Sequence, residues 1–132
     1  MGVANVENAP RQALEVNVQT VLRLLAWLPK SARLFFASTS EVYAGSVMAG
    51  IAPVPTPEAV PLSVPDLLNP RFAYATSKIL GEAAITYSTA HAVIGRFHNV
   101  YGPRMGTDHA IPALIVRMAR RPTLCQIYGP LQ

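Results

Sequence analysis

The chain of 132 residues is 51% hydrophobic, only 14% charged, and has a formal net charge of +4. This length supports one domain with its own core, and the apolar balance suits either strands buried on both faces or a fragment with exposed apolar surface. No apolar run approaches the roughly 18 residues of a membrane-spanning helix, and the basic residues lack aromatic interleaving, so we expect neither a membrane protein nor a nucleic-acid binder.

The first part of the chain predicts a helix, a strand and a long loop. Asn8-Ala9-Pro10 is typical of a helix start, with Asn8 as candidate N-cap, and apolar residues then recur at helical spacing until Pro29. The short apolar stretch 33–37 predicts a buried strand. Residues from about 45 to 70 are proline-rich and aperiodic, which favours either a binding lid or a passive surface excursion.

The second part continues the alternation of helix and strand. Residues from 74 to about 89 predict a helix with Ile79, Ala83 and Tyr87 along one stripe. The remaining predicted elements are a strand at 92–96, a helix at 111–121 and a strand at 124–128 that contains the lone Cys125. This order predicts an α/β fold with a parallel sheet. A single cysteine excludes an intramolecular disulfide and fits a cytoplasmic location, as does the lack of a leader pattern.

A tyrosine and a lysine at helical spacing form the first candidate site. Tyr74 and Lys78 are four residues apart and share one helix face. An ammonium held there can lower the pKa of a phenol, about 10 when unperturbed, toward the value that acid–base catalysis needs. The alternative is a half-buried aromatic on an amphipathic helix.

Hydroxyl and carboxyl groups follow the first predicted strand. In the run Ser38-Thr39-Ser40-Glu41-Val42-Tyr43, Thr39 or Ser40 can orient a substrate hydroxyl, and Glu41 can act as a second acid or base. Open α/β sheets bind ligands at the carboxyl ends of their strands. The alternatives are turn bonding by the hydroxyls and a merely exposed carboxylate. His98 and His109 have no partner at ligand spacing, so we expect structural histidines and no metal.

Together with Gly95-Arg96-Phe97-His98-Asn99-Val100-Tyr101-Gly102-Pro103, these motifs resemble the extended short-chain dehydrogenase/reductase family, specifically its NAD-dependent nucleotide-sugar epimerase/dehydratase branch. The resemblance runs from Asn5 to Gly129. It implies a Rossmann-like doubly wound parallel sheet, NAD as cofactor and a nucleotide sugar as substrate. The implied reaction is oxidation at C4, then epimerisation or decarboxylation, then reduction. A homodimer through the helix of Tyr74 and the first helix is also implied.

The resemblance assigns roles to individual residues. Tyr74 is the general base and Lys78 its tuner, and both also contact the cofactor. Thr39 best matches the catalytic Ser/Thr, with Ser40 beside it. The other implied positions are Ser38 at the cofactor, Asn99 and Tyr101 at the substrate, and Asn17 as a support of the site through backbone hydrogen bonds. Arg104 is a further candidate substrate contact, because guanidinium groups suit phosphate geometry, and the alternative is an exposed surface arginine.

The strand-end motif also bears on the subtype. Thr39-Ser40-Glu41-Val42-Tyr43 looks like the UDP-glucuronate decarboxylases, which keep a Ser-Glu pair, whereas 4,6-dehydratases carry Asp-Glu. Two departures from the family pattern stand out. Ala44 replaces the glycine that usually follows the Val-Tyr pair, and the interval from Thr39 to Tyr74 is longer than usual.

The sequence contains no G-x-x-G-x-x-G or G-x-G-x-x-G turn, which in the family holds the cofactor pyrophosphate. We therefore expect a fragment of a longer enzyme that begins with the tail of a strand and its loop at residues 2–6. Residues 1–109 are expected to form the central part of the NAD-binding domain, and 110–132 the start of the substrate-binding region. The alternative is a non-catalytic, truncated nucleotide-binding module.

Overall fold

The computed structural model of the chain describes residues 3–88, 90–107 and 109–120. It divides into two compact units, Met1–His98 and Asn99–Gln132. The predicted strand 124–128, with Cys125, lies outside the described residues. The predicted boundary at residue 109 is a functional one and stays a prediction.

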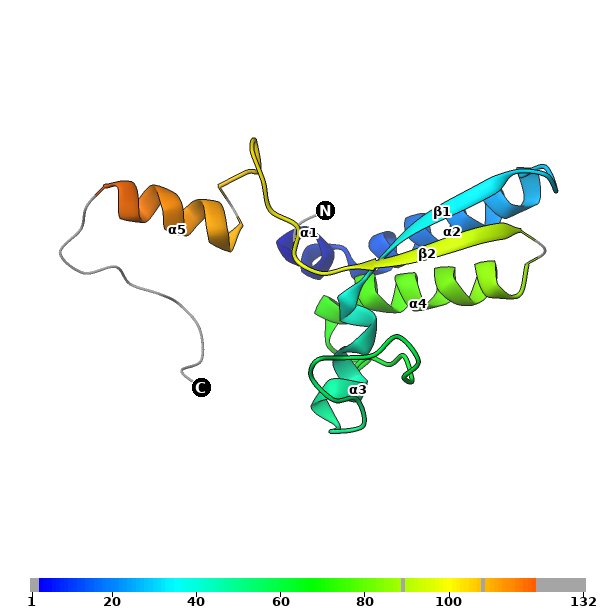
Figure 1. Cartoon of the computed structure of the whole chain (residues 1–132), viewed down its shortest axis with the longest axis horizontal. Coiled ribbons are helices and arrows are strands. Elements are labelled where there is room, and N and C mark those ends of the chain that lie inside the picture. The colour runs from blue at the N-terminus through cyan, green and yellow to red at the C-terminus, as the bar shows by residue number, and fades with distance from the viewer. Residues whose placement is uncertain (1–2, 89, 108, 121–132) are drawn as a thin grey trace. The chain divides into compact units, whose positions relative to one another are not determined.

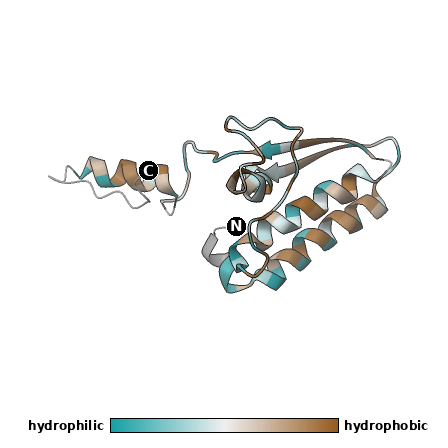
Figure 2. Cartoon of the chain, turned by 90° about the horizontal axis from the view of Figure 1, so that it is seen from below, coloured by the Kyte–Doolittle hydropathy of each residue, from teal (hydrophilic) through white to brown (hydrophobic). Residues whose placement is uncertain are grey.

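The first unit has two layers, a two-stranded parallel sheet and a pair of helices. The strands pair in register from Arg33↔His91 to Thr39↔Phe97, which confirms the α/β fold with a parallel sheet. Helices α2 and α4 pack side by side, and the strands lie over this pair (Figures 1 and 2). The elements are α1 (Val3–Asn8), α2 (Pro10–Trp27), β1 (Arg33–Thr39), η1 (Ser40–Tyr43), α3 (Ala44–Met48), η2 (Pro70–Phe72), α4 (Ala73–Thr86) and β2 (His91–Phe97).

Three expectations about individual elements were wrong: a strand tail at residues 2–6, an N-cap at Asn8 and a packed Tyr87. Residues 3–8 form helix α1 rather than a strand tail, because within the described residues the strands pair only with each other. Asn8 ends α1, and Ala9 takes the N-cap position of α2 without a side-chain bond; Pro10 follows with its φ preset for a helix. Tyr87 lies just past the end of α4 and is 87% exposed, so it takes no part in the packed stripe.

The two faces of the sheet differ in burial. Phe36 faces α4, where an ideal Cβ on Gly81 would lie 2.7 Å from the Phe36 Cζ, so glycine permits this close helix–sheet approach. On the opposite face Phe35, Val93 and Phe97 are 59%, 64% and 47% exposed. The rings of Phe35 and Phe97 pack edge to face with centroids 6.1 Å apart. The strands are therefore covered on one face by the helices, and their other face exposes apolar side chains.

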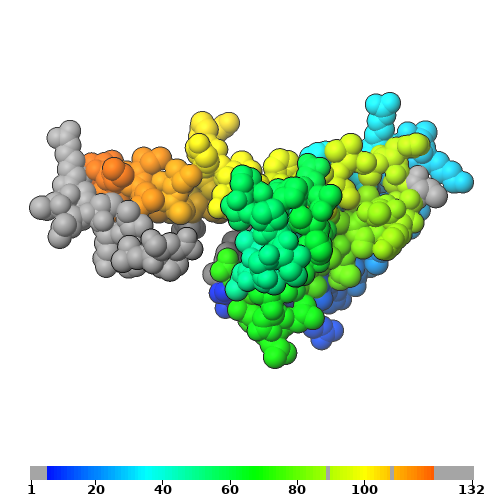
Figure 3. All heavy atoms as spheres, turned by 60° about the horizontal axis from the view of Figure 1, so that its bottom comes forward, coloured from blue at the N-terminus to red at the C-terminus, as the bar shows by residue number. Residues whose placement is uncertain are grey.

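The proline-rich segment contains a short helix and is hydrogen-bonded to the rest of the unit, which its composition does not predict. It begins with the short helix α3, so the expected loop starts only at residue 49. The loop returns to α3 and η1 through three bonds: Gly45 N–H to Ser63 O (2.9 Å), Ser63 N–H to Val42 O (2.9 Å), and Ser46 Oγ to Pro61 O (2.5 Å). In the space-filling view of Figure 3, α3 and the loop (teal to green) form one continuous mass.

The second unit contains one described helix, α5 (Ala110–Ala119), which confirms the helix predicted there. Across the described residues, no helix is long and apolar enough to cross a membrane.

Replacing Gly45 with Ala tests the close contact between α3 and the loop. An added Cβ would lie 2.8 Å from the backbone C and O of Val64, which cannot rotate away as a side chain can. We expect the Gly45→Ala variant to lose about 1–3 kcal/mol of unfolding free energy in a denaturant titration. Gly106→Ala is the matched control, because no atom lies within 4 Å of its Cβ position. Equal stabilities of the two variants would refute the contact.

Candidate functional site

Tyr74 and Lys78 lie on the same face of α4, one turn apart. Helix α4 begins at Ala73 directly after η2, and Tyr74 is in its first turn. The Lys78 Nζ lies 5.5 Å from the centroid of the Tyr74 ring and 4.8 Å from that of Phe36. It donates a hydrogen bond of 2.8 Å to the carbonyl oxygen of Ala37. The lysine therefore joins α4 to the last part of strand β1.

The expected lowering of the Tyr74 pKa is not found. Burial raises the pKa of the Tyr74 phenol above its usual 10, and the nearby carboxylate of Glu41 raises it further. Burial also lowers the pKa of Lys78. The ammonium lies near the tyrosine ring and is bonded to Ala37, so it does not offset the lost hydration of the phenol. In this state Tyr74 holds its proton and is a poor base.

The strand-end hydroxyls lie between β1 and η1. Thr39 ends β1, and its Oγ1 accepts a hydrogen bond of 3.3 Å from the backbone N–H of Glu41, which is the turn bonding foreseen as an alternative. Ser40 and Glu41 open η1, and all three residues are partly buried. Glu41 acts electrostatically on Tyr74. The structure thus places Glu41, predicted as a second acid or base, close enough to affect the phenol of Tyr74.

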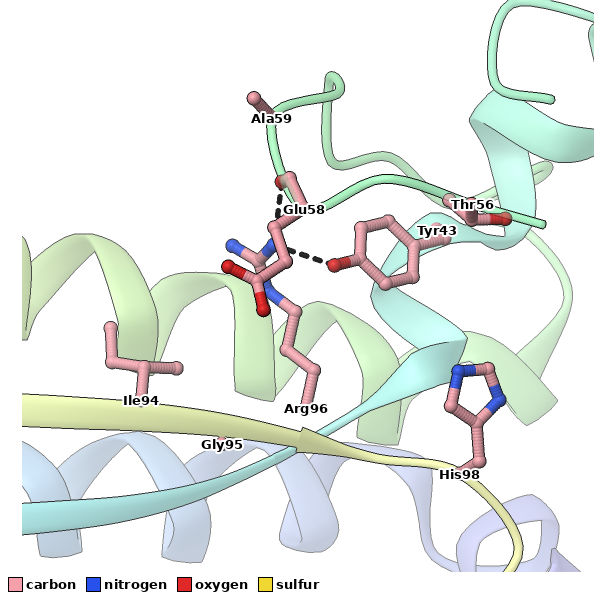
Figure 4. A pocket seen from close by; sticks show the side chains of 8 residues that line it. All are labelled: Tyr43, Thr56, Glu58, Ala59, Ile94, Gly95, Arg96 and His98. Carbon is pink, nitrogen blue, oxygen red and sulfur yellow. Dashed lines mark hydrogen bonds between the residues drawn. The ribbon is translucent and has the colours of Figure 1, made fainter. Parts of the chain in front are cut away.

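The side chain of Ser38 points into the core. It is buried, and its Oγ donates a bond of 2.5 Å to Glu82 Oε1. The role of Ser38 at the cofactor stays a prediction. Glu82 also accepts from Arg96, at 3.0 Å from Nε and 2.7 Å from Nη2. The Arg96 Nη1 donates to the Tyr43 hydroxyl (2.7 Å) and the Glu58 carbonyl (3.0 Å), as Figure 4 shows.

Sequence reasoning missed the roles of Glu82 and Arg96. One signal was available for Glu82, which follows Tyr74 and Lys78 at the same four-residue interval and so shares their helix face. A carboxylate on the packed face of a helix is rarely buried without a partner. The identity of that partner could not be predicted, because Arg96 lies 14 residues further along the chain, on strand β2.

An open pocket of about 580 Å³ lies beside this network, at the end of β2. His98, expected to be structural, is exposed and lines it, and His109 is exposed at the N-cap of α5. In the described part of the chain, no three His, Cys, Asp or Glu side chains gather as metal ligands would. The pocket lining, drawn in Figure 4, comprises Tyr43, Thr56, Glu58, Ala59, Ile94, Gly95, Arg96 and His98.

Asn17 contacts α4 through a side chain, whereas backbone hydrogen bonds were expected of it. Its Nδ2 donates a bond of 2.9 Å to the Oγ of Ser77, and that hydroxyl donates a bond of 2.6 Å to the carbonyl oxygen of Tyr74. This relay joins α2 to the first turn of α4. Ser77 itself is buried, so the relay is protected from water.

The three predicted substrate contacts lie in the second unit. Asn99, Tyr101 and Arg104 are all exposed there, and Arg104 has a positive φ of 67°. Their roles in substrate binding stay predictions.

A pH titration tests the electrostatics around Tyr74. We expect the Tyr74 phenol to ionise above pH 10, measured as the phenolate absorbance lost in the Tyr74→Phe variant. Since the folded-state pKa is raised, the associated stability is present below pH 10 and is lost as the pH rises through the folded pKa. Glu41→Gln should lower this pKa, whereas Glu15→Gln, an exposed change on α2, should not. A Tyr74 pKa below 10 would contradict this account.

Comparison with known proteins agrees with the geometry. The sequence profile of the NAD dependent epimerase/dehydratase family matches residues 1–132. No curated protein and no solved structure matches the chain. The parallel strands and helices are consistent with part of a Rossmann-like fold. The chain therefore belongs to the NAD-dependent epimerase/dehydratase family.

Proposed function

We propose that this chain provides the acid–base segment of an enzyme that acts on a nucleotide sugar by oxidation at C4, a rearrangement and re-reduction. The observation that carries the proposal is the arrangement of Tyr74 and Lys78 on one face of α4, with Glu41 acting on the phenol from η1, just after β1. Carboxyl ends of parallel strands are where open α/β sheets bind their ligands. Family membership supports the reaction class.

Each side chain then has a defined task. Tyr74 takes the proton of the sugar hydroxyl and later returns it. To do so its pKa must fall from the raised value of the chain alone, and a cationic ligand beside the ring would have that effect. Thr39 and Ser40 orient the hydroxyl, while Glu41 moves a second proton.

The residues present fit one half of the cofactor. NAD would supply the acceptor, and later the donor, of the hydride. The Lys78 ammonium has three donors and gives one to Ala37, which leaves two for the ribose that Tyr74 and Lys78 would hold. The sequence contains no glycine-rich phosphate turn, so this fit concerns the nicotinamide half only.

Within the family we favour decarboxylation over dehydration, because Ser40 stands where dehydratases carry an aspartate. Oxidation of a glucuronate at C4 gives a β-keto acid, which loses CO₂ readily, and reduction restores the sugar. Epimerisation through the same C4 ketone is the other outcome, so the enzyme would be a lyase or an isomerase. For its assembly we propose a homodimer through α2 and α4, which expose Val16, Leu22 and Leu80.

A second candidate function is a nucleotide-binding module without turnover. The raised pKa of Tyr74 favours it, because a phenol that holds its proton cannot serve as the base. The missing phosphate turn favours it as well.

The Tyr74→Phe variant separates these two functions. With UDP-glucose and UDP-glucuronate as probes, we expect NADH formation to fall roughly 100- to 10,000-fold, because the proton acceptor is gone. NAD at about 100 times its Kd should still add roughly 2.7 kcal/mol to the stability of the folded variant. Tyr87→Phe is the control, since Tyr87 is 87% exposed. Unchanged turnover in Tyr74→Phe would refute the assignment, and a parent that binds NAD without forming NADH would support the module.

The Glu41→Gln variant tests the second proton transfer. We expect C4 oxidation to proceed while the following step slows, so that NADH accumulates and CO₂ release from UDP-glucuronate drops. Glu15→Gln on the exposed face of α2 serves as the control. Parental rates of CO₂ release and epimerisation in Glu41→Gln would show that Glu41 is a bystander.

A further inference from the structure

We propose that the Glu82–Arg96 pair is a positioning device that holds the strand end and the proline-rich loop against the helix of Tyr74. Its effect on the loop is independent of any reaction, and its effect on turnover rests on the proposed function. Neither residue is placed at the reacting atoms, so both act through the segments they hold.

The buried Glu82 carboxylate accepts hydrogen bonds from residues on both strands. Its side chain is only 5% exposed, and its two oxygens accept from the Ser38 hydroxyl and from two nitrogens of Arg96. A buried charge is tolerated only with partners of good geometry, so these bonds fix the relative positions of three elements. Those elements are α4, β1 and β2.

Arg96 extends the pair outward. With Nε and Nη2 on Glu82, its Nη1 reaches the Tyr43 hydroxyl at 2.7 Å and the Glu58 carbonyl at 3.0 Å (Figure 4). The guanidinium also lies 5.1 Å from the Tyr43 ring centroid. A planar fork can make these contacts together, whereas a lysine ammonium cannot, because it offers a single point of attachment.

The Glu82–Arg96 pair is bonded to residues on both sides of the proposed catalytic segment 39–41. Ser38 immediately precedes Thr39, and Tyr43 ends η1, so residues on both sides of the segment 39–41 are bonded to one ion pair. Glu82 belongs to the same helix face as Tyr74. The distance between the hydroxyl-bearing segment and the phenol thus depends on a contact two turns away from the phenol.

The same pair holds the middle of the loop 49–69. The return of the loop is bonded to α3 and η1 at residues 61–63, but its stretch near Glu58 reaches the core through Arg96 Nη1. Thr56, Glu58 and Ala59 line the pocket at the end of β2. Releasing the Glu58 carbonyl would therefore let the pocket wall move.

Limited proteolysis measures the release of the loop at Glu58. A glutamyl endopeptidase cuts the peptide bond after Glu58, whose carbonyl Arg96 binds. We expect Arg96→Lys to raise the initial rate of cleavage after Glu58 by about tenfold or more. Cleavage after Glu15, inside α2, reports unfolding of the whole unit and should rise much less than cleavage after Glu58. Arg33→Lys, an exposed change on β1, is the matched control and should alter neither rate.

Tyr43→Phe keeps the test decisive if Arg96→Lys unfolds the unit. This change removes one hydroxyl bonded to Arg96 and keeps the ring, and we expect a smaller but selective rise in cleavage after Glu58. Should neither variant cleave selectively after Glu58, or should both sites respond equally in Tyr43→Phe, the pair is only a general stabilising contact and the proposal is overturned.

Kinetics test the catalytic consequence with UDP-glucuronate and NAD as probes. We expect kcat to fall roughly 10- to 100-fold in Arg96→Lys with the KM for NAD unchanged, the pattern of misplacement rather than lost binding. An unchanged kcat alongside selective cleavage after Glu58 would refute the catalytic part. A parental chain without turnover would refute the proposed function, while the proteolysis would still decide the effect on the loop.

Discussion

The carboxylate of Glu82 is buried between a helix and two strands, and a charge in that place constrains everything around it. Its oxygens are satisfied by Ser38 and Arg96, and losing either bond would leave a buried charge partly unpaired, which costs far more than a surface contact. The positions of β1, β2 and α4 follow from this requirement. Gly81, which precedes Glu82, has no side chain and so lets α4 lie close to Phe36. This close approach allows Glu82 to reach Ser38 and Arg96.

The state of Tyr74 shows what the chain contributes and what a ligand must add. The spacing of Tyr74 and Lys78 places both groups on one helix face, yet burial and Glu41 raise the pKa of the phenol. Position and protonation are thus set by different parts of the molecule. With its pKa raised, Tyr74 holds its proton firmly, and acid–base exchange with a substrate requires a change in the local field that lowers this pKa.

Local patterns in the sequence predicted most elements, and contacts between distant residues explain the failures. Helical periodicity located α2 and α4, and the apolar stretches located β1 and β2, because these signals depend on neighbours in the chain. The start of the chain was misjudged, since a strand needs a partner strand whereas α1 bonds within itself. The hydrogen-bond partner of Ser38 could not be predicted either, because Glu82 is 44 residues away in the chain. No periodicity encodes such a pairing, nor the loss of hydration that sets the pKa of Tyr74.

The outer sheet face has a practical consequence. Phe35, Val93 and Phe97 form an exposed apolar face, and in the described part of the chain each strand is paired along one edge only. Unpaired strand edges next to apolar surface are templates for further strands from other molecules. Solubility, rather than unfolding, would then limit the concentration at which the chain can be handled. A charged side chain at the position of Val93 would interrupt the apolar face and leave the Glu82 contacts untouched.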